Sequence, residues 1–173
     1  MTGPVDTDQQ LGRDDRIIRT ETFAELLAAT DHMAAQAQHS LRIVALDTEP
    51  ELYGREAFAA LVADFIRRRH KVARVQLLLA DPRRATQVTH HLVQLWHRFP
   101  SFIEFRELRD EYARTREALM IVDDTGIIRR PEAGVPAAVI TYRSLTTARD
   151  RAAWFAEAFA RAAPCSVLRR LSL

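Results

Sequence analysis

The stretch Arg114-Thr115-Arg116-Glu117-Ala118-Leu119-Met120-Ile121-Val122-Asp123-Asp124-Thr125-Gly126-Ile127-Ile128-Arg129 decides the fold. Its apolar run, Ala118 to Val122, predicts a strand that is buried on both faces. Two acidic residues and a glycine follow, which is typical of a tight turn, and the next apolar run predicts a second strand. We therefore expect a β-hairpin whose first strand is buried.

Before this hairpin, predicted helices alternate with predicted strands. Apolar residues repeat every three or four positions in the helices, whereas the strands are short, largely apolar runs. The expected order is helix Thr22 to Gln38, strand Leu41 to Asp47, helix Arg55 to Arg69, strand Val72 to Ala80, helix Arg83 to Phe99 and strand Phe102 to Arg106. Strands that are joined through helices favour parallel pairing and right-handed crossovers.

After the hairpin, the sequence predicts a loop at 131–136 and a strand from Ala137 to Tyr142. A last helix, capped by Thr146 or Thr147, should end at Pro164 and be followed by a strand-like tail, Leu168 to Leu173. The expected fold class is therefore three-layer α/β with a mixed β-sheet. Residues 1–19 lack periodicity and are interpreted as a flexible lead-in, and residues 20–173 as a single domain.

Composition excludes several functional classes. The chain has 173 residues, a formal net charge of +2 and one cysteine, Cys165, so neither an internal disulfide nor a cysteine-rich zinc site is expected. No apolar run is long enough to span a membrane, and residues 1–15 lack the apolar segment of a signal peptide. We expect a cytoplasmic protein with no metal and no cofactor.

The order of elements, with Ala-Leu-Met-Ile-Val-Asp-Asp in the hairpin strand and Trp154 and Phe155 in the closing helix, resembles one half of the phospholipase D superfamily from about Thr22 onward. Four shorter segments resemble an uncharacterised bacterial family with a phospholipase D-like fold. These are Asp47 with Leu52-Tyr53, His90-His91-Leu92-Val93 with Leu95, Ile103-Glu104-Phe105-Arg106, and Leu168-Arg169-Arg170-Leu171.

The superfamily signature is His-x-Lys-x4-Asp, in which the histidine attacks phosphorus and the lysine holds the phosphate oxygens. Asp123 matches its aspartate, but Arg116 stands at the histidine position and Ala118 at the lysine position. Arginine stays protonated and has no lone pair for attack, and alanine cannot bind phosphate through its side chain. The resemblance thus implies a degenerate site without the usual phosphodiesterase chemistry. Because active members bring two motifs together, it also implies a homodimer.

Three aspartates follow predicted strands: Asp47, Asp81 and Asp123. Ligands of open α/β sheets gather outside the carboxyl ends of strands, so these carboxylates could share one rim of the sheet. We favour the alternative, in which each aspartate caps a helix or a turn.

Histidines and arginines supply the other candidates for ligand binding. His90 and His91 lie in the predicted third helix, where a hydrogen-bonding or packing role is favoured over metal binding. Five arginines cluster in the sequence around the hairpin: Arg106, Arg114, Arg116, Arg129 and Arg130. Arg116 either clamps a phosphate or carboxylate or, as we favour, pairs internally with Asp123 or Glu104.

The densest basic run is Arg67-Arg68-Arg69-His70-Lys71, at the end of the predicted second helix. Cations there favour the helix dipole, and we prefer this structural interpretation to contact with nucleic acid. No aromatic residues are interleaved with these arginines, so no stacking platform for single strands is predicted.

Three functional hypotheses follow. The first is a non-catalytic binding or interaction module for a phosphorylated ligand or a protein partner. The second is a phosphodiester- or phospholipid-processing enzyme whose displaced nucleophile is His90 or His91. The third is a nucleic-acid-binding regulator.

Overall fold

A single mixed sheet runs through the computed structural model, which describes residues 8–82, 90–109, 111 and 116–169. The strands are β1 (Ile18–Thr20), β2 (Ser40–Ala45), β3 (Arg74–Leu79), β4 (Ile103–Glu107), β5 (Ala118–Val122), β6 (Gly126–Arg130), β7 (Ala138–Thr141) and β8 (Ala163–Pro164). Their order across the sheet is β1-β7-β6-β5-β2-β3-β4-β8. The helices are α1 (Phe23–Ala35), α2 (Pro50–Tyr53), α3 (Glu56–Arg68), α4 (His91–Arg98), α5 (Thr147–Arg161) and α6 (Ser166–Arg169).

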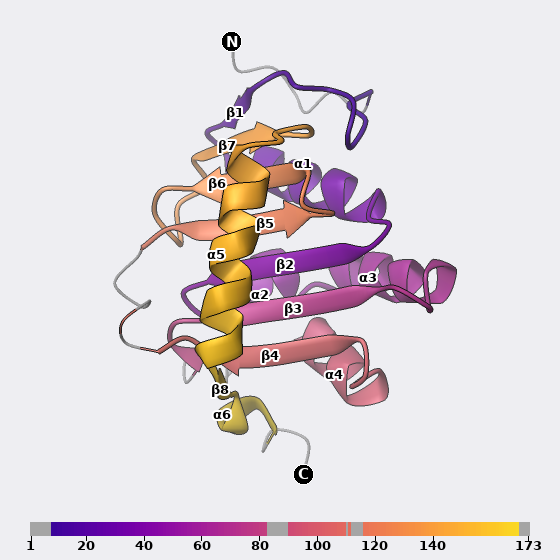
Figure 1. Cartoon of the computed structure of the whole chain (residues 1–173), viewed down its shortest axis with the longest axis vertical. Coiled ribbons are helices and arrows are strands. Elements are labelled where there is room, and N and C mark those ends of the chain that lie inside the picture. The colour runs from indigo at the N-terminus through magenta and orange to yellow at the C-terminus, as the bar shows by residue number, and fades with distance from the viewer. Residues whose placement is uncertain (1–7, 83–89, 110, 112–115, 170–173) are drawn as a thin grey trace.

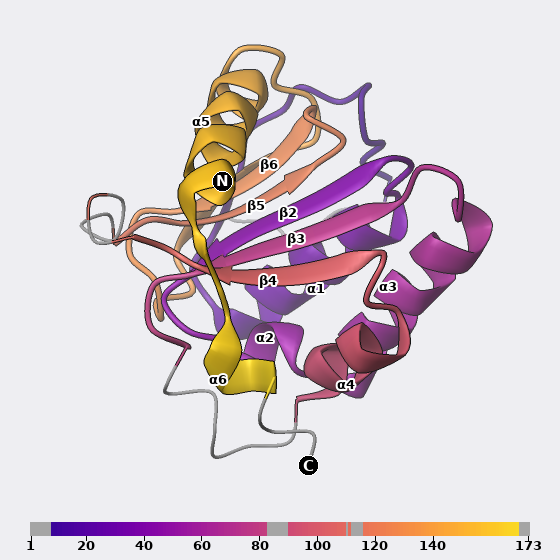
Figure 2. The same cartoon turned by 60° about the horizontal axis from the view of Figure 1, so that its bottom comes forward.

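The helices form a layer on each face of the sheet. α1, α3 and α4 cover one face, and the long helix α5 crosses the other (Figures 1 and 2). Strands β2, β3 and β4 pair in parallel, whereas β5 is antiparallel to both β2 and β6. The predicted three-layer α/β architecture on a mixed sheet is confirmed.

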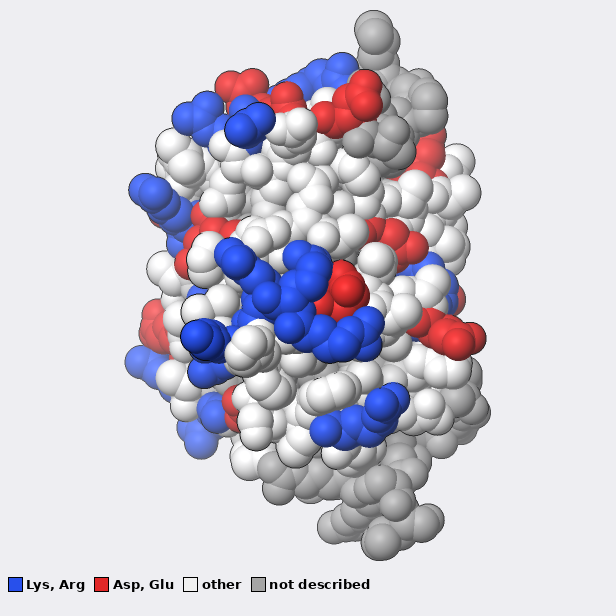
Figure 3. All heavy atoms as spheres, turned by 90° about the vertical axis from the view of Figure 1, so that its right-hand side faces the viewer, with Lys and Arg blue, Asp and Glu red and all other residues white. Residues whose placement is uncertain are grey.

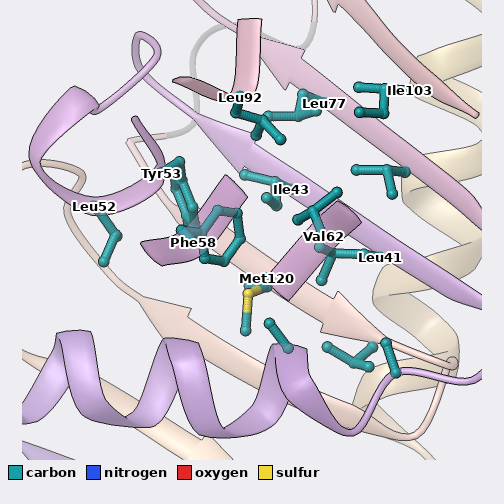
Figure 4. Close-up of a cluster of buried hydrophobic side chains, with 14 of the residues drawn as sticks. Leu41, Ile43, Leu52, Tyr53, Phe58, Val62, Leu77, Leu92, Ile103 and Met120 are labelled. Carbon is teal, nitrogen blue, oxygen red and sulfur yellow. The ribbon is translucent and has the colours of Figure 1, made fainter. Parts of the chain in front are cut away.

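Two apolar cores lie between these layers. In the larger one, Ile43 of β2 and Met120 of β5 face Phe58 and Val62 of α3 (Figure 4). The neighbouring residue of β2, Val44, belongs instead to the second core, which α5 covers with Phe155 and Phe159. Because successive strand residues point to opposite faces, a strand with a helix on both sides is apolar along most of its length. This explains the continuous apolar runs in the sequence.

Local sequence signals set the ends of α1 and of the hairpin. The hydroxyl of Thr22 accepts a hydrogen bond from the backbone amide of Glu25, whose carboxylate accepts one from the amide of Thr22, as a capping box requires. In the turn between β5 and β6, Asp123 and Asp124 both have φ of 54°, a left-handed conformation that aspartate tolerates better than most residues. The predicted hairpin is confirmed.

The predicted flexible lead-in is wrong for residues 8–19. β1 pairs with β7 in antiparallel register, and the amide of Gly12 donates to the carbonyl of Tyr142. Leu11 packs against the larger core, in space left by the missing side chain of Gly126. These contacts are tertiary and leave no periodic pattern in the sequence.

Further differences concern α2, α4 and the end of the chain. The loop predicted around Pro50 contains the short helix α2, in which proline occupies a first-turn position that needs no amide hydrogen. α4 begins at His91, whereas residues 83–89 of the longer predicted helix lie outside the described residues. At the end of the chain, β8 pairs with β4 and is followed by α6, which stands where the predicted strand-like tail begins. Residues 170–173 lie outside the described residues. Among the described helices, none is long and apolar enough to cross a membrane.

Candidate functional site

The direction of β5 separates the three candidate aspartates. β2 and β3 end at the side of the sheet that we call the carboxyl rim, where Asp47 and Asp81 follow them. β5 runs the other way, so Asp123 lies at the opposite side, the amino rim, where β2, β3 and β4 begin. The less favoured interpretation, a single rim for all three carboxylates, is wrong, because apolar periodicity identifies a strand but carries no information on its direction.

Asp123 has a structural role at the amino rim. One carboxylate oxygen accepts a hydrogen bond from the amide of Gln38 at 2.8 Å, and the other accepts from His39 at 2.7 Å and Ser40 at 2.9 Å. The carboxylate thus caps three successive amides that lead into β2. Asp47 likewise accepts from the amide of Glu49 at 2.7 Å, closing a local turn.

His90 is the N-cap of α4 and is 6% exposed. Its Nε2 lies 3.0 Å from the carbonyl oxygen of Thr48, and its Nδ1 accepts from the amide of Val93 at 3.3 Å. This pattern fits a neutral ring with its proton on Nε2. Burial lowers the pKa of His90, which also favours the neutral ring. Since Nδ1 is occupied and Nε2 carries the proton, neither nitrogen offers a lone pair for attack.

The other predicted candidates lie apart from one another. His91 is the half-buried first residue of α4, and its amide donates to the carbonyl of Gly54. Arg106 donates to Glu104 and to the carbonyl of Phe159, with its guanidinium 4.4 Å from the Phe159 ring. Within the described part of the chain, no three His, Cys, Asp or Glu side chains are grouped so that they could hold a metal ion.

Arg116 lies on the surface before β5, with its side chain 81% exposed, and pairs with Glu132 at 3.1 Å. The predicted internal pair with Asp123 or Glu104 is wrong. Asp123 lies at the far end of β5, and the carboxylate of Glu104 pairs with Arg106.

A buried ion pair at the carboxyl rim was missed by the sequence analysis. Arg130, the last residue of β6, donates to Glu49, and their side chains are 4% and 8% exposed. Arg130 is the sheet partner of Ala118, the residue at the lysine position of the motif. Because side chains alternate between the two faces of a strand, Arg130 lies on the same core-facing side as Ile128. This spacing is the sequence feature that could have predicted the burial of Arg130. Nothing in the sequence identifies Glu49, 81 positions away.

The surroundings of this pair are apolar. Burial raises the pKa of the Glu49 carboxyl, although the neighbouring Arg130 acts in the opposite direction, and burial also raises the pKa of the Tyr53 hydroxyl beside them. Glu49 has φ of 40°, an unusual left-handed conformation for a residue of this type. Its Oε1 is buried and has no hydrogen-bond partner among the described residues. Glu49 also lines a cavity of about 20 Å³, enough space for one water molecule.

The amino rim is more open. A hollow of about 670 Å³ lies between the segment before β1, the end of α1 and the β5–β6 turn. Its lining residues are Gln10, Leu11, Gly12, Ala35, Gln36, Gln38, His39, Asp123 and Thr125. Figure 3 looks onto this side of the molecule and shows lysine and arginine side chains gathered near its middle.

Comparisons with known proteins identify the fold. A family model described as "Domain of unknown function (DUF7931)" matches residues 22–171. A search of curated proteins found no match. Among solved structures, Nuc from Salmonella typhimurium, a phospholipase D family member, is 14% identical, with a TM-score of 0.53 over 86% of this chain and 95% of that one. NucT from Helicobacter pylori is 9% identical, with a TM-score of 0.58 over 86% and 98%.

A third similar structure is TrmBL2, described as an archaeal chromatin protein with a novel mode of DNA binding. It is 14% identical, with a TM-score of 0.59 over 87% of this chain, and the match spans 54% of the TrmBL2 chain. The fold is therefore phospholipase D-like.

Proposed function

This chain belongs to the DUF7931 family, and we propose that it is a non-catalytic phospholipase D-like module that binds a phosphorylated ligand. The observation that carries this proposal is the chemistry around the motif positions. Ala118 is fully buried beside an arginine that is already paired with Glu49, and Arg116 points to solvent and pairs with Glu132. A nucleophile and a phosphate-holding lysine are both missing from these positions.

The fold comparisons support the ligand class. One similar structure is a phospholipase D family member, and another is described as binding DNA. A ligand that contains phosphodiesters is consistent with both. We also propose, from the two-motif arrangement of the superfamily, that the chain forms a homodimer. Light scattering tests this directly, and a monomer over the whole concentration range would exclude it.

The competing function is an enzyme with a displaced histidine nucleophile. His90 is a poor candidate because its Nδ1 accepts from Val93 and its Nε2 faces the carbonyl of Thr48. His91 is half-buried and starts α4 next to it. A protein partner without phosphate is a further form of the binding proposal.

The proposal is tested by hydrolysis of bis(4-nitrophenyl) phosphate and of supercoiled plasmid, with the wild-type protein and the His91→Asn and His90→Asn variants. We expect no turnover above the buffer rate for any of the three proteins. Turnover that either substitution abolishes would support the displaced nucleophile. Turnover that survives both substitutions would overturn the non-catalytic proposal as well as the histidine mechanism.

A further inference from the structure

We propose that the amino rim of the sheet is a nucleic-acid interface, which binds the phosphate backbone of a duplex and does not read its sequence. The interface, here called the basic rim, consists of Arg67, Arg68, Arg69, Lys71, Arg74 and Arg98. This inference deepens the proposed binding function by naming a surface and a partner, and it rests on that function.

The fold itself brings these residues together. α3 ends at Arg68 and α4 ends at Arg98, and each helix precedes a parallel strand that begins at the amino rim. In such β-α-β units the helices run against the direction of the strands, so both helices must end on the same side of the sheet. Cations in their last turns favour the helix dipoles, and the crossovers then place both sets of cations at one rim. Figure 3 shows the resulting concentration of basic side chains.

Most of the charge at this rim is positive and exposed. All of these residues except the half-buried Arg69 are exposed, and the side chain of Arg67 is 65% exposed. The carboxylate of Asp64 contacts Arg68 at 2.6 Å and Arg67 at 3.9 Å. In the described part of the chain, no carboxylate pairs with Lys71, Arg74 or Arg98. A surface with this excess of cations attracts a polyanion.

Other carboxylates at this rim leave the charge positive. Asp123 keeps its negative charge while it caps three backbone amides, so it offsets one cation, and Asp124 forms an ion pair with Arg42, which is not part of the basic rim. Two guanidinium groups are held in place by the end of α1 and the segment after it, since Arg68 donates to the carbonyl of Ala35 and Arg69 to that of Gln38. Anchored guanidinium groups lose less freedom when they bind phosphate.

The surrounding surface favours a duplex over a single strand. Besides Leu11 and Asp123, the hollow beside the basic rim is lined mainly by small and amide side chains, and His39 is its one ring-bearing residue among the described ones. Binding of single strands generally requires aromatic side chains on which the bases stack. Duplex binding through phosphates needs only positioned cations, with arginine suited to bidentate contacts.

An anionic membrane is a weaker candidate for the same charge. Of the large apolar side chains exposed in the described residues, only Val72, at 45%, lies within the basic run. Surfaces that insert into a bilayer present a stripe of apolar side chains next to their cations. The basic rim has no such stripe in the described structure.

The experiment measures fluorescence anisotropy of a labelled, mixed-sequence DNA duplex of about 20 base pairs between about 50 and about 200 mM salt. The test variant is Arg67→Gln/Lys71→Gln/Arg74→Gln, which spares the anchored Arg68 and Arg69. The matched control is Arg19→Gln/Arg116→Gln/Arg161→Gln, which removes the same charge elsewhere on the surface. We expect the test variant to bind at least about tenfold more weakly at low salt. The slope of the logarithm of its binding constant against the logarithm of the salt concentration should be shallower by about three, and the control should bind like the wild-type protein.

Several outcomes would overturn this inference. They are no binding at the lowest salt, equal loss of affinity in both variants, or loss in the control alone, which would assign binding to the surface around the control arginines. Equally tight binding to phosphatidylserine vesicles, if the test variant also loses it, would show that the basic rim binds anionic surfaces in general. That result would also overturn the assignment to a duplex. None of these outcomes affects the non-catalytic proposal, which fails only if the protein hydrolyses phosphodiesters. Circular dichroism of both variants verifies that they are folded.

Discussion

The guanidinium of Arg130 and the carboxylate of Glu49 form an ion pair that is almost completely buried. Removal of one partner leaves an uncompensated charge in an apolar environment, which costs about 3–5 kcal/mol of unfolding free energy. We expect a loss of this size for Arg130→Met, measured by urea denaturation. The double variant Glu49→Leu/Arg130→Met should recover most of it, because neither charge is then buried. A double variant as unstable as Arg130→Met would show that the ion pair itself stabilises the fold and that the cost does not come from an unpaired charge.

The same carboxylate and His90 should make stability depend on pH in opposite directions. Burial raises the pKa of Glu49 above its ordinary value of 4.5, so the carboxyl ionises first in the unfolded state. Relative to Glu49→Gln, the wild-type protein should therefore lose stability as the pH rises from 4.5 through the raised pKa. Burial lowers the pKa of His90 below 6.5, so the unfolded state takes up this proton first.

Relative to His90→Asn, which keeps a side-chain oxygen for the N-cap, the wild-type protein should lose stability as the pH falls below 6.5. Urea denaturation of the three proteins across this pH range measures both effects. The explanation fails for either residue if its difference from the variant is constant with pH or has the opposite sign.

Asp123 and Asp124 provide a matched pair for separating a structural carboxylate from a turn residue. Both have φ of 54°, and asparagine tolerates this conformation. Asp123→Asn removes charge-assisted hydrogen bonds to three amides and should cost about 2 kcal/mol. Asp124→Asn weakens only the partly exposed pair with Arg42 and should cost less than about 1 kcal/mol. Equal losses of unfolding free energy in the two variants, measured by thermal or urea unfolding, would show that the hydrogen bonds to the Asp123 carboxylate do not stabilise the fold.

At the scale of single elements, β1 has a larger role than its three residues suggest. It covers the outer edge of β7, and Leu11 before it packs on the core. Deletion of residues 1–20 should lower the unfolding free energy by roughly 2 kcal/mol or more, because ladder hydrogen bonds contribute about 1 kcal/mol each. It should also promote association through the uncovered β7 edge. Deletion of residues 1–7 leaves these contacts intact and is the control for thermal unfolding and light scattering.

The elements also show what a sequence can and cannot predict. Buried strands and amphipathic helices were predictable because each residue's neighbours along the chain determine the pattern. The direction of β5, the pairing of β1 and the contact between Glu49 and Arg130 depend on residues far away in the sequence. The basic run could be identified in the sequence because its residues are neighbours along the chain. Its proximity to Arg74 and Arg98 could be identified only from the arrangement of the helices and strands.

For the whole molecule, the two rims lie at opposite ends of β2, β3 and β4, so their energetic effects should be independent. A duplex that binds only the folded protein, at about 100 times its dissociation constant, stabilises it by about 2.7 kcal/mol. For a domain of this size, that corresponds to an increase in Tm of about 5–10 °C. Glu49→Gln should keep the full increase, although its own Tm differs. The Arg67→Gln/Lys71→Gln/Arg74→Gln variant should lose most of the increase, as should the wild-type protein in high salt. An equal increase in Tm for the wild-type protein, Glu49→Gln and the triple variant at low salt would locate the duplex elsewhere on the surface. Binding at the basic rim must weaken when three of its cations are removed.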